Sequence, residues 1–223
     1  MIQDEIFERN FPFWEDLEES DRELIRKNSV EIHFEANEPV HDSTDCTGLY
    51  IVNSGRLRVF LLSEEGKEVT LYRLSTGGLC MLSASCVIQS IAFDVFVEAE
   101  EVTDCVVVSA SVIGGLIEKV PAVNIWALET TVTRFSDVMW VLQQIVFMSM
   151  DKRVAIFLYE ETLEKKSDSI TMTHEQIARH LGTAREVVSR MLKHFANDGI
   201  LEVTRKEIKI ADKKRLKAIA YDS

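Results

Sequence analysis

The stretch "MTHEQIARHLGTAREVVSRMLKHFANDGIL", from Met172 to Leu201, carries the strongest structural signal in the chain. Thr173 is followed three residues later by Gln176, which is the spacing of a capping box at the start of a helix. Gly182 supplies an end for that helix, because glycine readily adopts the left-handed backbone that follows many helix C-termini. A short helix over residues 174–181 is therefore expected.

A second helix is expected directly after Gly182, because Thr183 and Glu186 repeat the capping-box spacing. Its apolar residues, which recur at the spacing of one helix face, are Val188, Met191, Leu192 and Phe195. Two short helices joined by a tight glycine turn make a helix-turn-helix. The following stretch, "GILEVTRKEIKIA", predicts a two-stranded wing with Arg205 and Lys206 near its tip.

The charge of this region differs in sign from that of the whole chain. The formal net charge of the 223 residues is −12, yet residues 171–217 hold 11 Lys and Arg against 6 Asp and Glu. The remainder holds 14 basic and 31 acidic residues. A basic segment in an acidic protein is typical of a module that binds a polyanion. Chance clustering of solvated charges is the alternative.

DNA suits such a motif, because an α-helix fits the major groove with its N-terminal residues against base edges. Arg can bond guanine and Glu can accept from cytosine, whereas residues near phosphates hold register without reading sequence. For Glu186 a purely structural capping role is the alternative. The residues expected to contact DNA are Thr173, His174, Arg185, Glu186, Ser189, Arg190, Lys193, Arg205 and Lys206.

The chain up to about Ala110 has the pattern of an antiparallel sandwich or barrel. Short apolar runs such as "GLYIVNSG", "LRVFLL" and "DCVVVSA" are separated by turn signals that contain glycine or asparagine. A helical opening from about Pro12 to Asn28 precedes them. The chain thus combines an N-terminal β region with C-terminal helices, which predicts an α+β fold with three parts: residues 1–121, 122–148 and 149–223.

The middle part contains neither Pro nor Gly, and its apolar residues alternate at intervals of three and four. That alternation is the seam of a helix that packs along a partner helix. We expect a homodimer through this seam; a helix lying on the core of its own chain is the alternative. The seam residues are Ile125, Leu128, Val132, Phe135, Met139, Leu142 and Val146.

The order of β-barrel, long helix and winged helix-turn-helix resembles the Crp/Fnr family of bacterial transcription regulators, and "MTHEQIARHLGTAREVVSRMLKHFANDGIL" is the strongest match. The resemblance implies that the barrel is a cyclic-nucleotide-binding-like jelly roll that senses a signal. It also implies a homodimer on an inverted repeat of double-stranded DNA, with RNA polymerase as a further partner if the protein is an activator. In the family, the positions that match Arg185, Glu186, Ser189 and Arg190 lie in the recognition helix.

Other function classes fit less well. No nucleophile–base–acid constellation indicates an enzyme, and no metal-ligand spacing stands out. With no signal peptide and no run of about 18 apolar residues, we expect a cytoplasmic protein without a membrane partner. The alternative function is a cyclic-nucleotide-like module that binds an effector and regulates a protein partner or an enzyme rather than DNA.

The effector cannot be named from the family pattern. Cyclic-nucleotide binders of the family carry an Arg for the phosphate, but no Arg lies between Arg73 and Lys119, which argues against cAMP. The first cysteine is Cys46, which argues against the N-terminal iron–sulfur cluster of some members. Packing cysteines, a redox-sensing thiol, or a small ligand, haem or metal site all stay open. The expected pocket residues are Cys80, Leu82, Ser83, Ala84, Ser85 and Cys86.

Overall fold

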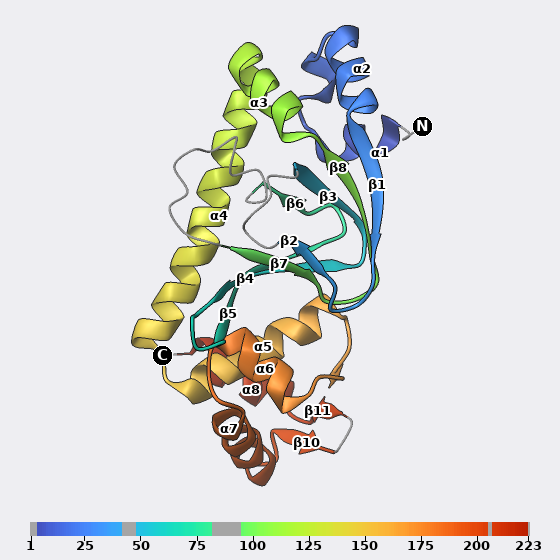
Figure 1. Cartoon of the computed structure of the whole chain (residues 1–223). Coiled ribbons are helices and arrows are strands. Elements are labelled where there is room, and N and C mark those ends of the chain that lie inside the picture. Colours follow the sequence, from blue (N-terminus) through green and yellow to red (C-terminus); the bar gives the residue numbers. More distant parts are fainter. Residues whose placement is uncertain (1–3, 42–47, 82–94, 205–206, 223) are drawn as a thin grey trace. The chain divides into compact units, whose positions relative to one another are not determined.

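The computed structural model describes residues 4–41, 48–81, 95–204 and 207–222. The chain divides into two compact units (Figure 1). The first comprises residues 1–62 and 71–138, and the second comprises residues 63–70 and 139–223. Each unit is described by itself.

The first unit opens with three short helical segments. They are α1 (Asp4–Asn10), the 3-10 helix η1 (Trp14–Asp16) and α2 (Glu19–Lys27). The expected single opening from Pro12 to Asn28 is wrong at its start, because α1 already begins at Asp4 and ends before Pro12. A proline disfavours helical backbone in the residue before it. The aromatic rings of this opening pack together, and Phe13 meets Trp126 edge-on at a centroid distance of 4.9 Å.

Two four-stranded sheets follow. The pairs β1–β8, β3–β8, β3–β6, β2–β7 and β4–β7 are antiparallel. One sheet has the order β1-β8-β3-β6 and the other β2-β7-β4-β5. Buried residues from both sheets, among them Tyr50, Val59, Val97 and Val107, form a shared core between them, which confirms the predicted β architecture. The strands are β1 (Ser29–Phe34), β2 (Pro39–His41), β3 (Leu49–Ser54), β4 (Arg56–Leu62), β5 (Glu68–Ser75), β6 (Leu79–Cys80), β7 (Phe96–Ala99) and β8 (Thr103–Val108).

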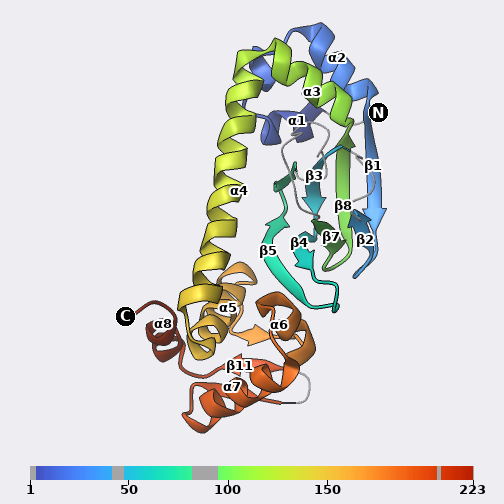
Figure 2. The same ribbon diagram turned by 60° about the vertical axis from the view of Figure 1, so that its left-hand side comes forward.

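Helix α3 (Ala110–Lys119) leads into α4 (Pro121–Phe147), which has 27 residues and runs without a break (Figure 2). Val123, Trp126 and Ala127 are its buried residues, and they pack into a second core with the aromatic opening. Among the described residues, no single helix is long and apolar enough to cross a bilayer. In the same described part of the chain, α3 and α4 pass that test when taken together, and they are bent by 115° at the break.

The second unit contains the expected helical pair and wing. Helix α5 (Met150–Glu164) precedes α6 (His174–Leu181) and α7 (Arg185–Asn197), and the chain ends in α8 (Lys213–Tyr221). The wing strands β10 (Leu201–Val203) and β11 (Ile208–Ile210) pair antiparallel as expected, but β9 (Ser169–Ile170) adds a third strand that the sequence pattern did not predict. A core of its own, which includes Leu158, Ile177, Leu192 and Leu216, holds these elements together.

Candidate nucleic-acid interface

The first helix of the helix-turn-helix begins and ends as its sequence predicts. The backbone N–H of Gln176 donates to Thr173 Oγ1 at 3.1 Å, and the backbone N–H of Thr173 donates to Gln176 Oε1 at 2.8 Å. Both halves of the capping box are therefore present. At the other end Gly182 has a φ of 63°, in the left-handed region that favours glycine. Helix α6 is thus fixed at both ends by local interactions.

The predicted second capping box is wrong. Helix α7 begins at Arg185, its N-cap is Ala184, and no side chain caps it. Thr183 therefore lies one residue before the cap, and Glu186 sits at the second helical position rather than the third. The structural alternative for Glu186 loses its basis, because its exposed carboxylate does not turn back to cap the helix.

Helix α7 has one buried and one exposed face. Val188, Leu192 and Phe195 are almost fully buried, which confirms the apolar stripe. The exposed residues on the other side are Arg185, Glu186, Arg190 and Lys193. Arg185, Glu186 and Arg190 offer guanidinium and carboxylate groups to solvent in the N-terminal half of the helix, which is the part that meets base edges when a helix lies in the major groove. Lys193 lies beyond that half.

His174 and Ser189 connect the two helices. His174 Nδ1 lies 2.8 Å from Ser189 Oγ, which joins the first residue of α6 to the middle of α7. Burial lowers the pKa of His174, and the neighbouring Arg185 lowers it further. The imidazole is therefore neutral at pH 7, and the expected DNA residues His174 and Ser189 also hold the motif together.

The remaining expected DNA residues lie at the edges of this surface. Thr173 is exposed at the start of α6. Arg205 and Lys206, at the predicted tip of the wing, lie outside the described residues. On either side of these two residues, Thr204 Oγ1 accepts from the backbone N–H of Glu207 at 3.1 Å.

Arg153 is a structural residue that no pattern in the sequence predicted. It lies on α5, is 8% exposed, and its Nη2 donates to the backbone carbonyl of Leu181. That carbonyl belongs to the last residue of α6, where helix carbonyls lack partners within the helix. Burial lowers the pKa of Arg153. The only hint in the sequence is a cation directly before the apolar run "VAIFL".

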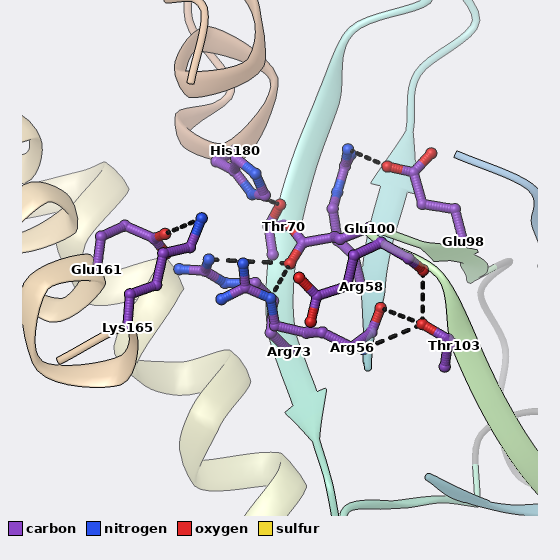
Figure 3. Close-up of polar contacts among 11 residues, drawn as sticks. Arg56, Arg58, Thr70, Arg73, Glu98, Glu100, Thr103, Glu161, Lys165 and His180 are labelled. Carbon is purple, nitrogen blue, oxygen red and sulfur yellow. Dashed lines mark hydrogen bonds and ion pairs between the residues drawn. The ribbon is translucent and has the colours of Figure 1, made fainter. Parts of the chain in front are cut away.

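The segment 63–70 belongs to the same unit and contacts α6. Glu68 Oε2 accepts from Arg179 Nε at 2.9 Å. Thr70 Oγ1 lies 2.9 Å from His180 Nδ1, a contact drawn in Figure 3. A Cβ added at Gly182 would lie 2.3 Å from a methyl group of Val69, so the turn of the motif needs glycine for space as well as for its backbone conformation. These partners lie more than 100 positions apart in the sequence and were not predicted.

Comparison with known proteins agrees with this geometry. Residues 152–219 match the Crp-like helix-turn-helix domain. A solved protein from Eubacterium rectale, assigned as a transcriptional regulator of the crp/fnr family, is 44% identical, with 94% of this chain and 98% of that chain covered and a TM-score of 0.90. The chain belongs to the Crp/Fnr family.

Two curated proteins are also similar to this chain over most of its length. The anaerobic regulatory protein of Pasteurella multocida is 24% identical over 89% of this chain and 73% of its own. The cyclic AMP receptor protein of Thermus thermophilus is 27% identical over 78% of this chain and 79% of its own. This Crp/Fnr chain is therefore a DNA-binding transcription regulator with an α+β fold. The alternative of a module that regulates only a protein partner loses its support.

The expected effector pocket of this Crp/Fnr chain is described only in part. Cys80 is fully buried on β6, in the core between the two sheets. Leu82, Ser83, Ala84, Ser85 and Cys86 lie outside the described residues. Burial, helped by the nearby Cys80, raises the pKa of the Cys105 thiol to about 12, so Cys105 stays protonated and unreactive at neutral pH. Among the described residues, no group of three or more His, Cys, Asp or Glu side chains is placed to hold a metal ion.

The seam of α4 is exposed in the single chain. Phe135 is 64% exposed, and the other six residues of the heptad series are 43–63% exposed. The helix contacts its own core through Val123, Trp126 and Ala127 instead. The seam residues are therefore not what attaches α4 to its own chain.

Proposed function

We propose that two copies of this chain pair through the exposed seam of α4 and bind an inverted repeat in double-stranded DNA. The observation that carries the proposal is the seam itself, seven large apolar side chains at heptad spacing and all at least 43% exposed. A contiguous apolar stripe of this kind marks an interaction surface. Apolar residues at alternating intervals of three and four let a helix pack along a second helix with the same pattern. A two-fold axis between the two copies brings the same residues of both together.

The two-fold axis sets the form of the DNA site. Each copy presents one α7, so the two half-sites are inverted with respect to each other and lie about one helical turn, or a multiple of it, apart. Arg185, Glu186 and Arg190 are assigned to base edges, because their exposed groups match guanine and cytosine in the major groove. Ser189, whose hydroxyl is hydrogen-bonded to His174, lies on the same helix.

Other residues are assigned to the phosphate backbone. Lys193 lies two turns along α7 from its start and is exposed. Thr173 and His174 stand at the N-terminus of α6, where backbone N–H groups favour phosphate. Arg205 and Lys206 are assigned by their charge and their place between the wing strands. Contacts of this class fix the register of the protein and make affinity depend on salt.

The first unit is assigned the sensing role. A signal controls DNA binding if it favours one arrangement of the two subunits over another, and the first four seam residues of α4 lie in this unit. The signal is proposed to be something other than cAMP, because the sequence has no Arg between Arg73 and Lys119 for the phosphate. If the regulator activates transcription, RNA polymerase is a further partner. We place the protein in the cytoplasm because its proposed target is DNA.

Selection from a pool of random double-stranded DNA tests the site. Repeated rounds with the full-length protein are expected to enrich an inverted repeat with half-sites about one helical turn apart. The same selection with Arg190→Ala serves as the matched control and is expected to lose base preference at one symmetric pair of positions. Enriched sequences without two-fold symmetry would overturn the proposed dimer on DNA, and enrichment of no sequence would overturn specific reading by α7.

A further inference from the structure

Ser189 differs from other hydroxyl residues that lie within helices of this protein. On α4, the hydroxyls of Thr131, Thr133 and Ser136 each donate to the carbonyl oxygen four residues earlier, at 2.8–3.1 Å, an arrangement that competes for many helical Ser and Thr side chains. Ser189 lies in the middle of α7, but its Oγ is 2.8 Å from His174 Nδ1 on the other helix of the motif. The direction of its hydroxyl is therefore set by a side chain of α6.

Ser189 also lies at the centre of the candidate DNA surface. It follows Arg185 by four residues and Glu186 by three, and it precedes Lys193 by four. Side chains at these spacings are neighbours on the surface of a helix. A base edge that Arg185 and Glu186 reach is therefore within reach of the Ser189 hydroxyl as well.

The hydrogen bond between His174 and Ser189 has two possible polarities. A neutral imidazole carries one N–H and one nitrogen that accepts. With the proton on Nδ1, the ring donates to Ser189 Oγ, and the serine O–H stays free to donate to a base. With the proton on Nε2, the ring accepts from the serine O–H, and Ser189 Oγ has only lone pairs left for a base.

The surroundings of His174 keep the imidazole neutral, so that only one of the two polarities holds at a time. Burial, and after it the charge of Arg185, lower the pKa of His174, and the ring therefore holds a single proton at pH 7. Within the described part of the chain His174 bonds through Nδ1. Nε2 is left for a partner outside the protein, and the chemistry of that partner decides where the proton lies.

The start of α6 suits a phosphate as the partner of Nε2. His174 is the first residue of the helix, and the capping box takes up the N–H of Gln176, which is the third. The earlier N–H groups of a helix have no acceptor within it, and they favour an anion at this end. A phosphate oxygen accepts hydrogen bonds and does not donate them. An imidazole beside it therefore presents Nε2–H and leaves Nδ1 as the acceptor.

We propose that His174 is a positioning residue that fixes which group of a base Ser189 recognises. In the complex with DNA, His174 Nε2–H donates to a phosphate, Nδ1 accepts from the Ser189 hydroxyl, and Ser189 Oγ accepts from an amino group in the major groove. The amino groups exposed there are N4 of cytosine and N6 of adenine. The inference rests on the base reading proposed for α7 and adds the polarity of one contact.

Base analogues test this polarity on DNA selected by the full-length protein. Affinities of the wild type and Ser189→Ala for the selected duplex and its single-base changes locate the base pair that Ser189 reads. At that pair, 2-pyrimidinone in place of cytosine, or purine in place of adenine, removes only the amino group. The 7-deaza form of the guanine or adenine at the same pair removes the N7 acceptor instead.

The wild type and Ser189→Ala are expected to differ in one of these comparisons only. Loss of the amino group is expected to weaken the wild type roughly three- to tenfold more than Ser189→Ala, because one hydrogen bond is lost. Changes in the DNA itself affect both proteins and cancel. Loss of N7 is expected to weaken both proteins equally. The proposal is overturned if loss of the amino group affects both proteins equally, if the difference follows N7, or if Ser189→Ala changes no base preference.

His174→Arg separates the positioning role from a structural one. Arginine keeps donors for a phosphate but has no acceptor, so it cannot take the hydrogen bond from Ser189. We expect the variant to change its affinity for every duplex by a similar factor and to lose the extra sensitivity to the amino group. Glu175→Gln, at the next and exposed residue of α6, raises the net charge by the same amount and is expected to keep that sensitivity.

Full sensitivity in His174→Arg would show that His174 does not set the contact. The comparison of the wild type with Ser189→Ala decides the polarity even if His174→Arg does not fold, which thermal unfolding checks. If an inverted repeat is selected but loss of the amino group affects both proteins equally, this inference fails and the proposed function stands. If the selected DNA lacks two-fold symmetry but shows the Ser189-dependent loss, the proposed dimer on DNA fails and the roles of His174 and Ser189 stand.

Discussion

His174 Nδ1 lies 2.8 Å from Ser189 Oγ and thereby joins the two helices of the helix-turn-helix. The contact gives two residues of the candidate DNA surface a second role, since their hydrogen bond sets how α7 lies against α6. The pair is sensitive to pH, because burial and the nearby Arg185 lower the pKa of His174. A protonated imidazole has no acceptor nitrogen and meets an unfavourable charge there.

The first prediction concerns stability at acid pH. The pKa of His174 is lower in the folded state than in the unfolded chain, where it is about 6.5. The unfolded state therefore takes up the proton first, so the contribution of His174 to stability is complete above about pH 6.5 and declines as the pH falls below that value. Urea unfolding between pH 7.5 and 5.5 is expected to show a steeper loss of unfolding free energy for the wild type than for His174→Gln.

The raised pKa of His33 does not disturb this comparison. Asp104 and the nearby Glu35 raise the pKa of His33. The contribution of His33 to the free energy of unfolding therefore grows as the pH falls, by the same amount in the wild type and in His174→Gln. The difference between the two curves isolates His174. Parallel curves for the two proteins would show that His174 does not resist protonation in the folded state.

The second prediction concerns the buried Arg153. Arg153→Met keeps much of the aliphatic volume but leaves the carbonyl of Leu181 without its donor. A hydrogen bond to a charged group contributes about 1.5–3 kcal/mol, and we expect a loss of that order in the free energy of unfolding of the second unit. Lys152→Met is the matched control, because the neighbouring Lys152 is only half-buried. Equal urea midpoints for the two variants would mean that the Arg153 contact contributes nothing measurable.

Local signals made most of the helix-turn-helix predictable from sequence. The capping box of Thr173 and Gln176 and the left-handed Gly182 depend on residues a few positions apart, and both occur as expected. The same reasoning failed at Thr183 and Glu186, because a correct spacing does not decide which residue begins the helix. There the structure starts α7 at Arg185 without a side-chain cap.

Contacts between distant segments left no such signal. Glu68 and Arg179 are 111 positions apart, and neither residue type is unusual in its local stretch. The same holds for Tyr72 and Arg134, which only the packing of β5 near α4 brings together. The heptad alternation did predict an apolar face on α4, but only the structure shows that this face is exposed while Val123 and Trp126 attach the helix to its own core.

The third prediction concerns the seam. In the proposed dimer, Phe135 lies against the second copy, so Phe135→Asp would bury two like charges near the two-fold axis at a cost of several kcal/mol. Sedimentation equilibrium at low micromolar concentration is expected to show a dimer for the wild type and a monomer for Phe135→Asp. Thr133→Asp is the control, because Thr133 is also exposed on α4 but lies outside the heptad series. A Phe135→Asp dimer would place the subunit contact elsewhere.

The last prediction separates base reading from phosphate binding on α7. Arg190 and Lys193 are both exposed cations on the same helix, so charge alone predicts equal effects for Arg190→Ala and Lys193→Ala. If Arg190 reads a base, Arg190→Ala loses about 1–3 kcal/mol on the selected DNA and discriminates less between bases at one position of each half-site. If Lys193 meets a phosphate, Lys193→Ala weakens binding to all sequences about equally and lowers the dependence of affinity on salt.

These changes in affinity, base discrimination and salt dependence are measured by titrating both variants with DNA at three salt concentrations. The duplexes are the selected DNA, four single-base changes of it and an unrelated sequence. Glu186→Gln completes the set, because it removes the carboxylate charge at an exposed position that does not cap the helix. It is expected to change the preferred base at one position rather than the general affinity, since a carboxylate accepts from cytosine and repels phosphate. Uniform effects from all three variants across every duplex would show that α7 contributes only electrostatic attraction, and that sequence is read by another part of the protein.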